Sequence, residues 1–201
     1  MRTHTTPLAA VAVAAALLMT GCGAAPATDT AAVTEAPEIT GDLSAADSMF
    51  LAMMIPHHEQ AMDMAEIVLA ADGVDDRVRA IAERIKAAQG PEIATMRGWL
   101  DTSGVDAGAM DHGAHGGMDG MLTEAQMDAL RAASGAEATR LFLEGMIQHH
   151  EGAILMAQGV LVNGRNAEVR ALAEDIVRAQ QAEIDEMRDL LAAMDGGGSA
   201  P

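Results

Sequence analysis

One pattern in this chain occurs twice, and this internal repeat limits the possible folds more than any other feature of the sequence. Residues 50–69 and residues 142–161 are identical at 12 of 20 positions. A second pair of stretches, residues 78–100 and residues 169–191, is identical at 13 of 23 positions. The members of the two pairs are separated by 92 and 91 residues, so one unit of two segments is repeated. The chain is therefore expected to contain two copies of one folded unit.

Each segment of the repeat has the apolar spacing of an α-helix. In the first segment, Phe50, Met54, Ala61, Ala65 and Val68 recur at intervals of three, four and seven residues. No stretch has the alternating pattern of a β-strand. Because one hairpin of two such helices cannot bury its apolar stripes alone, two hairpins are expected to pack together. The predicted fold class is all-α, a four-helix bundle built from two repeated helical hairpins.

The same spacing divides the chain into helices and connections. Helices are expected over about residues 43–71, 74–100, 123–134, 137–162 and 166–194. Ser44 or Asp42 can cap the first helix, and Thr123 with Gln126 has the pattern of a capping box. The bundle would span residues 43–194, with repeat one at 43–100, a loop at 101–122, the short helix at 123–134 and repeat two at 137–194. Residues 195–201 are rich in glycine and are expected to be disordered.

The first 42 residues are expected to lie outside the bundle. Residues 1–21 resemble a lipoprotein signal peptide, because Arg2 precedes an apolar run, residues 8–18, that is too short to span a bilayer. Small residues stand before Cys22, which would become the lipidated N-terminus and anchor the exported protein to the extracytoplasmic side of the cell membrane. An ordinary cleaved signal with an incidental cysteine is the alternative. Residues 22–42, rich in Ala, Thr and Pro, are predicted to form a flexible tether.

Composition limits the chemistry of any site in the domain. Cys22 is the single cysteine, so a metal would have to be bound through nitrogen, oxygen or thioether sulfur. The formal net charge of −18 argues against a nucleic-acid partner, which requires a basic surface. The 16 methionines, against two Phe, one Trp and no Tyr, have two explanations. Methionine fills helical cores, and its thioether also binds Cu(I).

Adjacent histidines are the main functional signal in the repeat. His57 and His58 in the first copy correspond to His149 and His150 in the second, and each pair is followed by Glu. If each hairpin is antiparallel, the histidines face a Gln, a Glu and a Met on the second helix. A lone buried histidine is usually a hydrogen-bonded core residue, but a repeated pair with a facing carboxylate favours a metal site. The candidate ligands are His57, His58, His149, His150, Glu92, Glu183, Met54, Met146, Met64, Met156, Met96 and Met187.

The loop between the two repeats is rich in glycine and in side chains that bind metals. Met110, His112, His115 and Met118 are secondary candidate ligands, of the kind expected in a weak metal-collecting segment. A plain linker is the alternative for this loop.

The two motifs together resemble a known family. The pattern Met-Ile-x-His-His-x-x-Ala-x-x-Met-Ala, followed by Gln-x-x-Glu-Ile-x-x-Met-x-x-x-Leu, is similar to the family called domain of unknown function 305, and the resemblance covers about residues 45–192. It implies a ferritin-like bundle of paired hairpins in mostly secreted bacterial proteins that are associated with copper binding and copper tolerance. Members often carry Asp before the Phe. Asp47 fits this pattern, whereas Thr139 takes that place in the second copy, so the two halves need not be equivalent.

Copper, as Cu(I) or Cu(II), is the expected metal, because His and Met without thiolate suit it best, and zinc and iron are the alternatives. The first functional hypothesis is an extracytoplasmic copper-binding lipoprotein that serves buffering, delivery or tolerance. A ferroxidase-like oxidase is an alternative, although the Glu-x-x-His motif of di-iron bundles does not occur in the sequence. A structural or interaction module without metal is the second alternative. The expected partners are a metal ion and, through the lipid anchor, the membrane.

Overall fold

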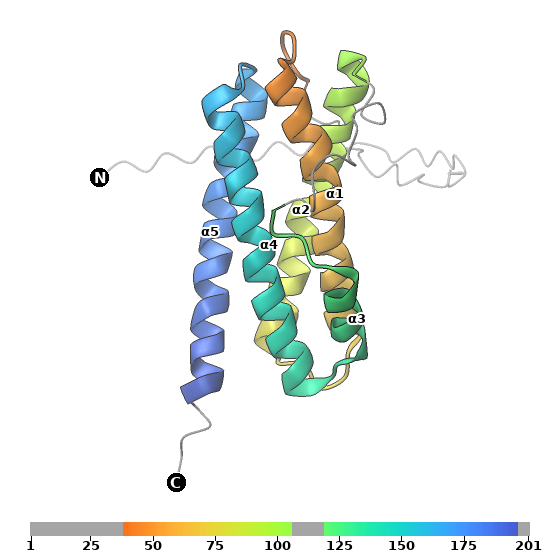
Figure 1. The fold of residues 1–201 in the computed structure, drawn as a ribbon, viewed down its shortest axis with the longest axis vertical. Helices are drawn as coiled ribbons and strands as arrows, with labels where there is room; N and C mark the ends of the chain where they lie inside the picture. Colours follow the sequence, from red (N-terminus) through yellow and green to blue (C-terminus); the bar gives the residue numbers. More distant parts are fainter. Residues whose placement is uncertain (1–37, 106–118, 197–201) are drawn as a thin grey trace, which may run out of the picture. The chain divides into compact units, whose positions relative to one another are not determined.

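The computed structural model describes residues 38–105 and 119–196. In these ranges the chain forms five α-helices and no strand, and the prediction of an all-α fold is confirmed. The helices are α1 (Ala45–Ala70), α2 (Asp76–Ser103), α3 (Glu124–Ala132), α4 (Gly135–Asn163) and α5 (Ala167–Gly196) (Figure 1). The predicted signal peptide, Cys22, most of the predicted tether and residues 197–201 lie outside the described residues.

The four long helices lie side by side (Figure 1). Helices α1 and α2 form one antiparallel hairpin, α4 and α5 form the second, and α1 packs against α4 between them. The short helix α3 packs on α1 and α4. Figure 1 also shows that α2 and α4 run in the same direction, so the chain between them has to return along the bundle. None of the helices in the described ranges is long and apolar enough to cross a membrane.

Local signals set the ends of these helices. Ser44, one of the two predicted caps, is the N-cap of α1, and it forms a capping box with Asp47 that was not predicted. Thr123 is the N-cap of α3, in the predicted capping box with Gln126. Helix α2 continues to Ser103 and α5 to Gly196, both a few residues past the predicted ends. Helix α1 continues through Pro56, and α2 continues through Pro91.

The core consists of two apolar clusters with a polar layer between them. One, here called the Phe50 cluster, contains Phe50, Leu51, Met54, Ile93, Met96, Trp99, Leu100, Ala157, Val160, Val169 and Ile176. The other, here called the Phe142 cluster, contains Met64, Val68, Val78, Ile81, Ile85, Leu130, Phe142, Leu143, Met146, Ile184 and Met187. Along each long helix, with the exception of Ile154 in α4, the residues of the two clusters are separated by a His pair or by a Gln and a Glu. The polar residues of the repeat therefore meet at the middle of the bundle.

Each hairpin is also fastened to the turn of the other hairpin. The buried carboxylate of Asp47 in α1 accepts hydrogen bonds from the backbone N–H groups of Arg165 (3.1 Å) and Asn166 (3.2 Å), just before α5. At the equivalent place in α4, the Thr139 hydroxyl accepts a hydrogen bond from the backbone N–H of Asp75 (3.3 Å), just before α2. Asp47 and Thr139 thus occupy equivalent positions, and each accepts a hydrogen bond from the turn of the other hairpin, although the two side chains differ.

Candidate metal centre

Four histidines form the middle of the polar layer, and all four are fully buried. The rings of His57 in α1 and His149 in α4 lie against each other, with centroids 3.8 Å apart and planes tilted by 40°. The rings of His149 and His150 have centroids 6.4 Å apart. The two His pairs, which are 92 residues apart in sequence, therefore meet in one interior.

Helix geometry explains why the two members of a pair have different neighbours. Successive residues of an α-helix point about 100° apart around its axis. His57 therefore reaches across to the other hairpin, while His58 reaches the second helix of its own hairpin. His58 Nε2 lies 2.7 Å from Glu92 Oε2 in α2, and His150 Nε2 lies 2.7 Å from Glu183 Oε2 in α5.

These carboxylates determine which ring nitrogen is left without a partner. A carboxylate oxygen accepts, so Nε2–H of His58 and of His150 donates to Glu92 and Glu183. The Nδ1 atoms of both rings are buried and have no hydrogen-bond partner. A metal-binding histidine typically has this arrangement, in which one nitrogen is oriented by a carboxylate and the other is directed at the metal.

The two central rings differ from each other. His57 Nε2–H donates to the backbone carbonyl of Asp119 (3.2 Å), and its Nδ1 has no partner. Neither ring nitrogen of His149 has a hydrogen-bond partner. All four Nδ1 atoms of the layer are therefore buried and unpaired, which is unfavourable unless a ligand satisfies them.

Burial also keeps the central rings neutral. It lowers the pKa of His57 to about 3, with further lowering by His58 and His150 and a smaller opposing contribution from the hydrogen bond to Asp119. Burial lowers the pKa of His149 well below its usual value, the other three histidines lower it further, and the backbone of His57 makes a small opposing contribution. Only a neutral imidazole nitrogen can bind a metal, so these rings are in the competent form at neutral pH.

Two glutamines complete the layer. Gln89 in α2 is 2% exposed, and neither its Oε1 nor its Nε2 has a hydrogen-bond partner. Gln180, its counterpart in α5, is 4% exposed, and its Oε1 has no partner. Both residues recur in the repeat, so the layer contains unpaired amide groups in both halves.

The predicted methionine ligands are divided between the two apolar clusters. Met54 and Met96 belong to the Phe50 cluster, and Met64, Met146 and Met187 belong to the Phe142 cluster. All five are fully buried, whereas Met156 is half-buried at the edge of the Phe50 cluster. Packing of the core is thus established for these thioethers, and their role as ligands stays a prediction.

The Glu that follows each His pair lies outside the layer. Glu59 pairs with Arg97, and Glu151 pairs with Arg188 (2.6 Å), in each case between the two helices of one hairpin. All four side chains are well exposed. Their repetition in both copies therefore reflects a repeated surface ion pair, which adds little stability and binds no interior metal.

The described part of the chain contains no group of three or more His, Cys, Asp or Glu side chains that is already arranged to hold a metal ion. The Nε2 atoms of His58 and His150 are occupied by Glu92 and Glu183, and His57 and His149 contact each other ring to ring. Metal binding in this layer therefore requires small ring rotations, thioether ligands, or both.

A second set of contacts at the layer was not foreseen from the sequence. Residues 119–122, here called the return segment, cross α1 and α4 beside the histidines. The Gln60 side chain hydrogen-bonds both the N–H (2.8 Å) and the carbonyl (2.9 Å) of Leu122. The Gln148 amide donates to the carbonyls of Gly120 (3.3 Å) and Met121 (3.5 Å). The last four residues of the predicted loop, residues 119–122, are therefore part of the site.

The sequence signal for this segment lies in the departures from the repeat. Gln60 and Gly152 occupy the same repeat position, and both contact the return segment from opposite helices. Gln148 replaces Pro56, and it also contacts the segment. These two positions, where the copies of the repeat differ, thus mark the place where the connection between the repeats crosses α1 and α4. The secondary candidates Met110, His112, His115 and Met118 lie outside the described residues.

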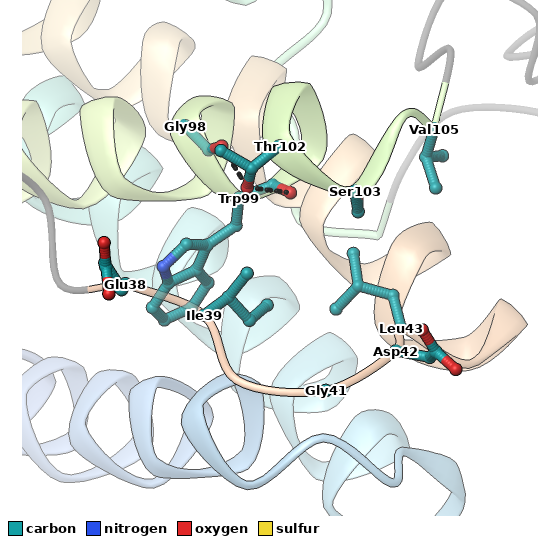
Figure 2. A pocket seen from close by; sticks show the side chains of 10 residues that line it. All are labelled: Glu38, Ile39, Gly41, Asp42, Leu43, Gly98, Trp99, Thr102, Ser103 and Val105. Carbon is teal, nitrogen blue, oxygen red and sulfur yellow. Dashed lines mark hydrogen bonds between the residues drawn. The ribbon is translucent and has the colours of Figure 1, made fainter.

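A separate cavity of about 940 Å³ opens beside the end of α2 (Figure 2). Ile39 and Leu43, from the segment before α1, line it together with Trp99 and Thr102 of α2. The Thr102 hydroxyl hydrogen-bonds the carbonyls of Gly98 (2.9 Å) and Trp99 (3.2 Å) in its own helix. The lining residues include no histidine or methionine, so this cavity is distinct from the histidine layer.

Comparison with known proteins identifies the family. Residues 47–191 match the family described as Domain of unknown function (DUF305). The chain belongs to the DUF305 family. Among solved structures, a DUF305 protein of Streptomyces coelicolor that is inferred to be secreted is 34% identical, with a TM-score of 0.67, over 74% of this chain and 91% of its own. A DUF305 fragment from Deinococcus radiodurans is 32% identical, with a TM-score of 0.69, over 76% of this chain and 99% of its own.

Several of the similar solved structures contain metal. The Cu(II)-bound form of the protein CopM is 33% identical, with a TM-score of 0.62, over 74% of this chain and 97% of its own. CopM has also been solved bound to Cu(I) and to silver. An uncharacterized protein of Acanthamoeba polyphaga mimivirus is 40% identical over 50 residues, which is a third of that protein's length. This chain is thus related to a protein that binds copper and silver.

Proposed function

We propose that this DUF305 protein binds copper outside the cytoplasm, in the histidine layer at the middle of the bundle, for copper buffering, delivery or tolerance. The observation that carries the proposal is the set of four fully buried histidines whose Nδ1 atoms all lack a partner. The similarity to CopM supports copper as the metal.

In this proposal the ligand set combines histidine nitrogen with methionine sulfur. Imidazole suits Cu(II), and thioether sulfur favours Cu(I). His57, His58, His149 and His150, from α1 and α4, supply the nitrogens. The buried methionines belong to the two apolar clusters beside the layer, Met54 and Met96 to the Phe50 cluster and Met146 and Met187 to the Phe142 cluster. A zinc site would make no use of these thioethers, so copper uses the observed donor set more fully than zinc does.

For Glu92 and Glu183 we propose a role other than the direct metal binding that was expected from the sequence. Each accepts a hydrogen bond from a histidine Nε2, so we assign them to positioning the His58 and His150 rings rather than to direct metal binding. A carboxylate in this place raises the basicity of the ring and holds its orientation. Their negative charges would also offset part of the charge of a buried cation.

The central test removes one histidine from each pair. The double variant His57→Ala/His149→Ala should lose at least about 100-fold in copper affinity, measured by competition titration, while circular dichroism shows the helices retained. The matched control is Glu59→Gln/Glu151→Gln, which alters the neighbouring residue of each repeat on the surface and should bind copper as the wild type does. Near-normal copper affinity in the histidine variant would contradict a histidine-layer site.

Two further features belong to the proposal. We assign the bundle to the ferritin-like type, and the parallel run of α2 and α4 with a long connection between them supports this.

We also expect Cys22 to be lipidated and to anchor the exported chain at the membrane. The intact mass of the protein purified from membranes checks the anchor, and an unmodified chain that begins elsewhere would exclude it.

A further inference from the structure

The return segment is fitted to the bundle more closely than a simple linker requires. A Cβ atom on Gly152 of α4 would lie 1.9 Å from the Asp119 carbonyl oxygen and 2.7 Å from Gly120 Cα, so only glycine allows the segment to lie there. Gly120 itself has a positive φ of 86°, and a Cβ on it would lie 2.6 Å from the Gln148 carbonyl oxygen. Two glycines, one on each side of the contact, therefore permit backbone to pack directly on backbone.

This close approach places the Asp119 carbonyl at the histidine layer. The carbonyl accepts the hydrogen bond from His57 Nε2–H, at 3.2 Å. In doing so it holds the neutral His57 ring in the tautomer whose Nδ1 carries the free lone pair. A backbone carbonyl is one of the usual partners of a metal-binding histidine.

His149 lies at the equivalent place in the second half, and it has no such partner. Neither of its ring nitrogens has a hydrogen-bond partner in the return segment, and its ring is packed against the ring of His57. The chain has one connection between its two repeats, so only one of the two central rings can be held in this way.

We propose that the return segment is a positioning element of the metal site, and that it makes the two halves of the site inequivalent. Asp119 fixes His57 as the preoriented ligand, while His149 rotates onto the metal when it binds. Gln60, Gln148 and Gly152 act through the segment by holding it on α1 and α4. This inference rests on the proposed copper site.

The test displaces the segment and leaves every candidate ligand in place. Gly152→Ala introduces a Cβ that the docked segment cannot tolerate, and Gly159→Ala is the matched control in the same helix, because a Cβ there meets nothing within 4 Å. Both changes raise the helix propensity of α4 equally, so a difference between them reports on the segment. Gln60→Ala is a milder second variant, which removes two hydrogen bonds to Leu122 without a steric clash.

Two measurements on the full exported chain decide the proposal. In the metal-free protein, NMR of the imidazole protons should show a protected His57 Nε2–H in the wild type and in Gly159→Ala. That signal should be lost in Gly152→Ala, while the corresponding protons of His58 and His150 persist as internal references. Copper affinity from competition titration should fall by about 10–100-fold in Gly152→Ala and by less in Gln60→Ala, which is the usual effect of losing an outer partner of a histidine ligand.

The outcomes separate this inference from the proposed function. If Gly152→Ala loses the His57 signal but binds copper like Gly159→Ala, the positioning role is overturned and the copper site stands. If the His57 signal persists in Gly152→Ala, the contact to Asp119 does not orient the ring. If the wild-type protein binds no copper, the proposed function fails, and the positioning role falls with it.

Discussion

At the scale of single residues, the histidine layer combines groups that are unfavourable to bury. His57 and His149 are fully buried, uncharged and incompletely hydrogen-bonded, and Gln89 and Gln180 leave amide atoms unpaired. Each unpaired buried polar group costs about 1–3 kcal/mol of stability. A bundle selected only for stability would place apolar residues here, so the layer indicates a function that needs these donors.

The lowered histidine pKa values predict that the metal-free protein loses stability in mild acid. Between pH 6.5 and about 3, His57 takes up a proton in the unfolded chain but not in the folded one, so the free energy of unfolding falls as the pH falls. His57 alone should remove about 2 kcal/mol between pH 6.5 and pH 5, and His149 acts in the same direction. Chemical denaturation at pH 7 and pH 5 measures this loss.

The variant His57→Leu/His149→Leu provides the control for that experiment. Leucine does not titrate, so its free energy of unfolding should depend much less on pH over the same interval. An equal loss of stability in the wild type and in the leucine variant would assign the acid sensitivity to other groups.

At the scale of elements, only part of the connection between the two hairpins belongs to the described residues. The return segment, residues 119–122, is held on α1 and α4 by side-chain and backbone contacts. The part of the connection that carries Met110, His112, His115 and Met118 lies outside the described residues. Substitution rather than deletion separates the two parts, because it preserves the length of the connection.

Replacing Met110, His112, His115 and Met118 together by alanine should therefore remove weak, additional copper equivalents. The tightest site should keep its affinity, since none of its proposed ligands is changed and the return segment stays docked. Titration of the wild type and the quadruple variant with Cu(I) and Cu(II) measures both effects. A large loss at the tightest site would show that these side chains take part in it.

At the scale of the whole molecule, each hairpin is fastened to the turn of the other by a buried side chain near the start of α1 or α4. Asp47 in α1 accepts hydrogen bonds from Ser44, Arg165 and Asn166, and these bonds outweigh the effect of burial and lower its pKa. Thr139 in α4 makes the corresponding contact to Asp75. These contacts join the two hairpins at both ends of the bundle, in addition to the packing of the two apolar clusters.

Asp47→Ala should destabilise the fold by about 2–4 kcal/mol, because it removes a capping box and leaves two turn N–H groups without their acceptor. Asp63→Ala, at an exposed position of the same helix, is the control and should have little effect. Thermal unfolding of both variants measures the difference. Because the Asp47 pKa is lowered, its contribution is lost only as the pH falls below the ordinary value of 3.8, which is below the interval from pH 7 to pH 5 in which the histidine effect is measured.

Much of this protein follows from its sequence by local rules. Helical spacing, caps such as Ser44 and Thr123, and the internal repeat were enough to predict an all-α fold of two hairpins and to bring the His pairs and their facing Glu residues into one interior. These features depend on the period of the helix and on residues that are a few positions apart in the chain. Both can be recognised in the sequence without knowledge of the tertiary structure.

The assignment of partners was decided only by the tertiary structure. Which histidine of a pair meets Glu92 and which meets the other hairpin depends on how each helix is rotated about its axis. That rotation is set by packing over the whole bundle, which also places Glu59 and Glu151 on the surface. The hydrogen bond from His57 to Asp119 joins residues 62 positions apart through a close approach at Gly152. Such a contact has no local period, and it exists only because the folded helices create the space for it.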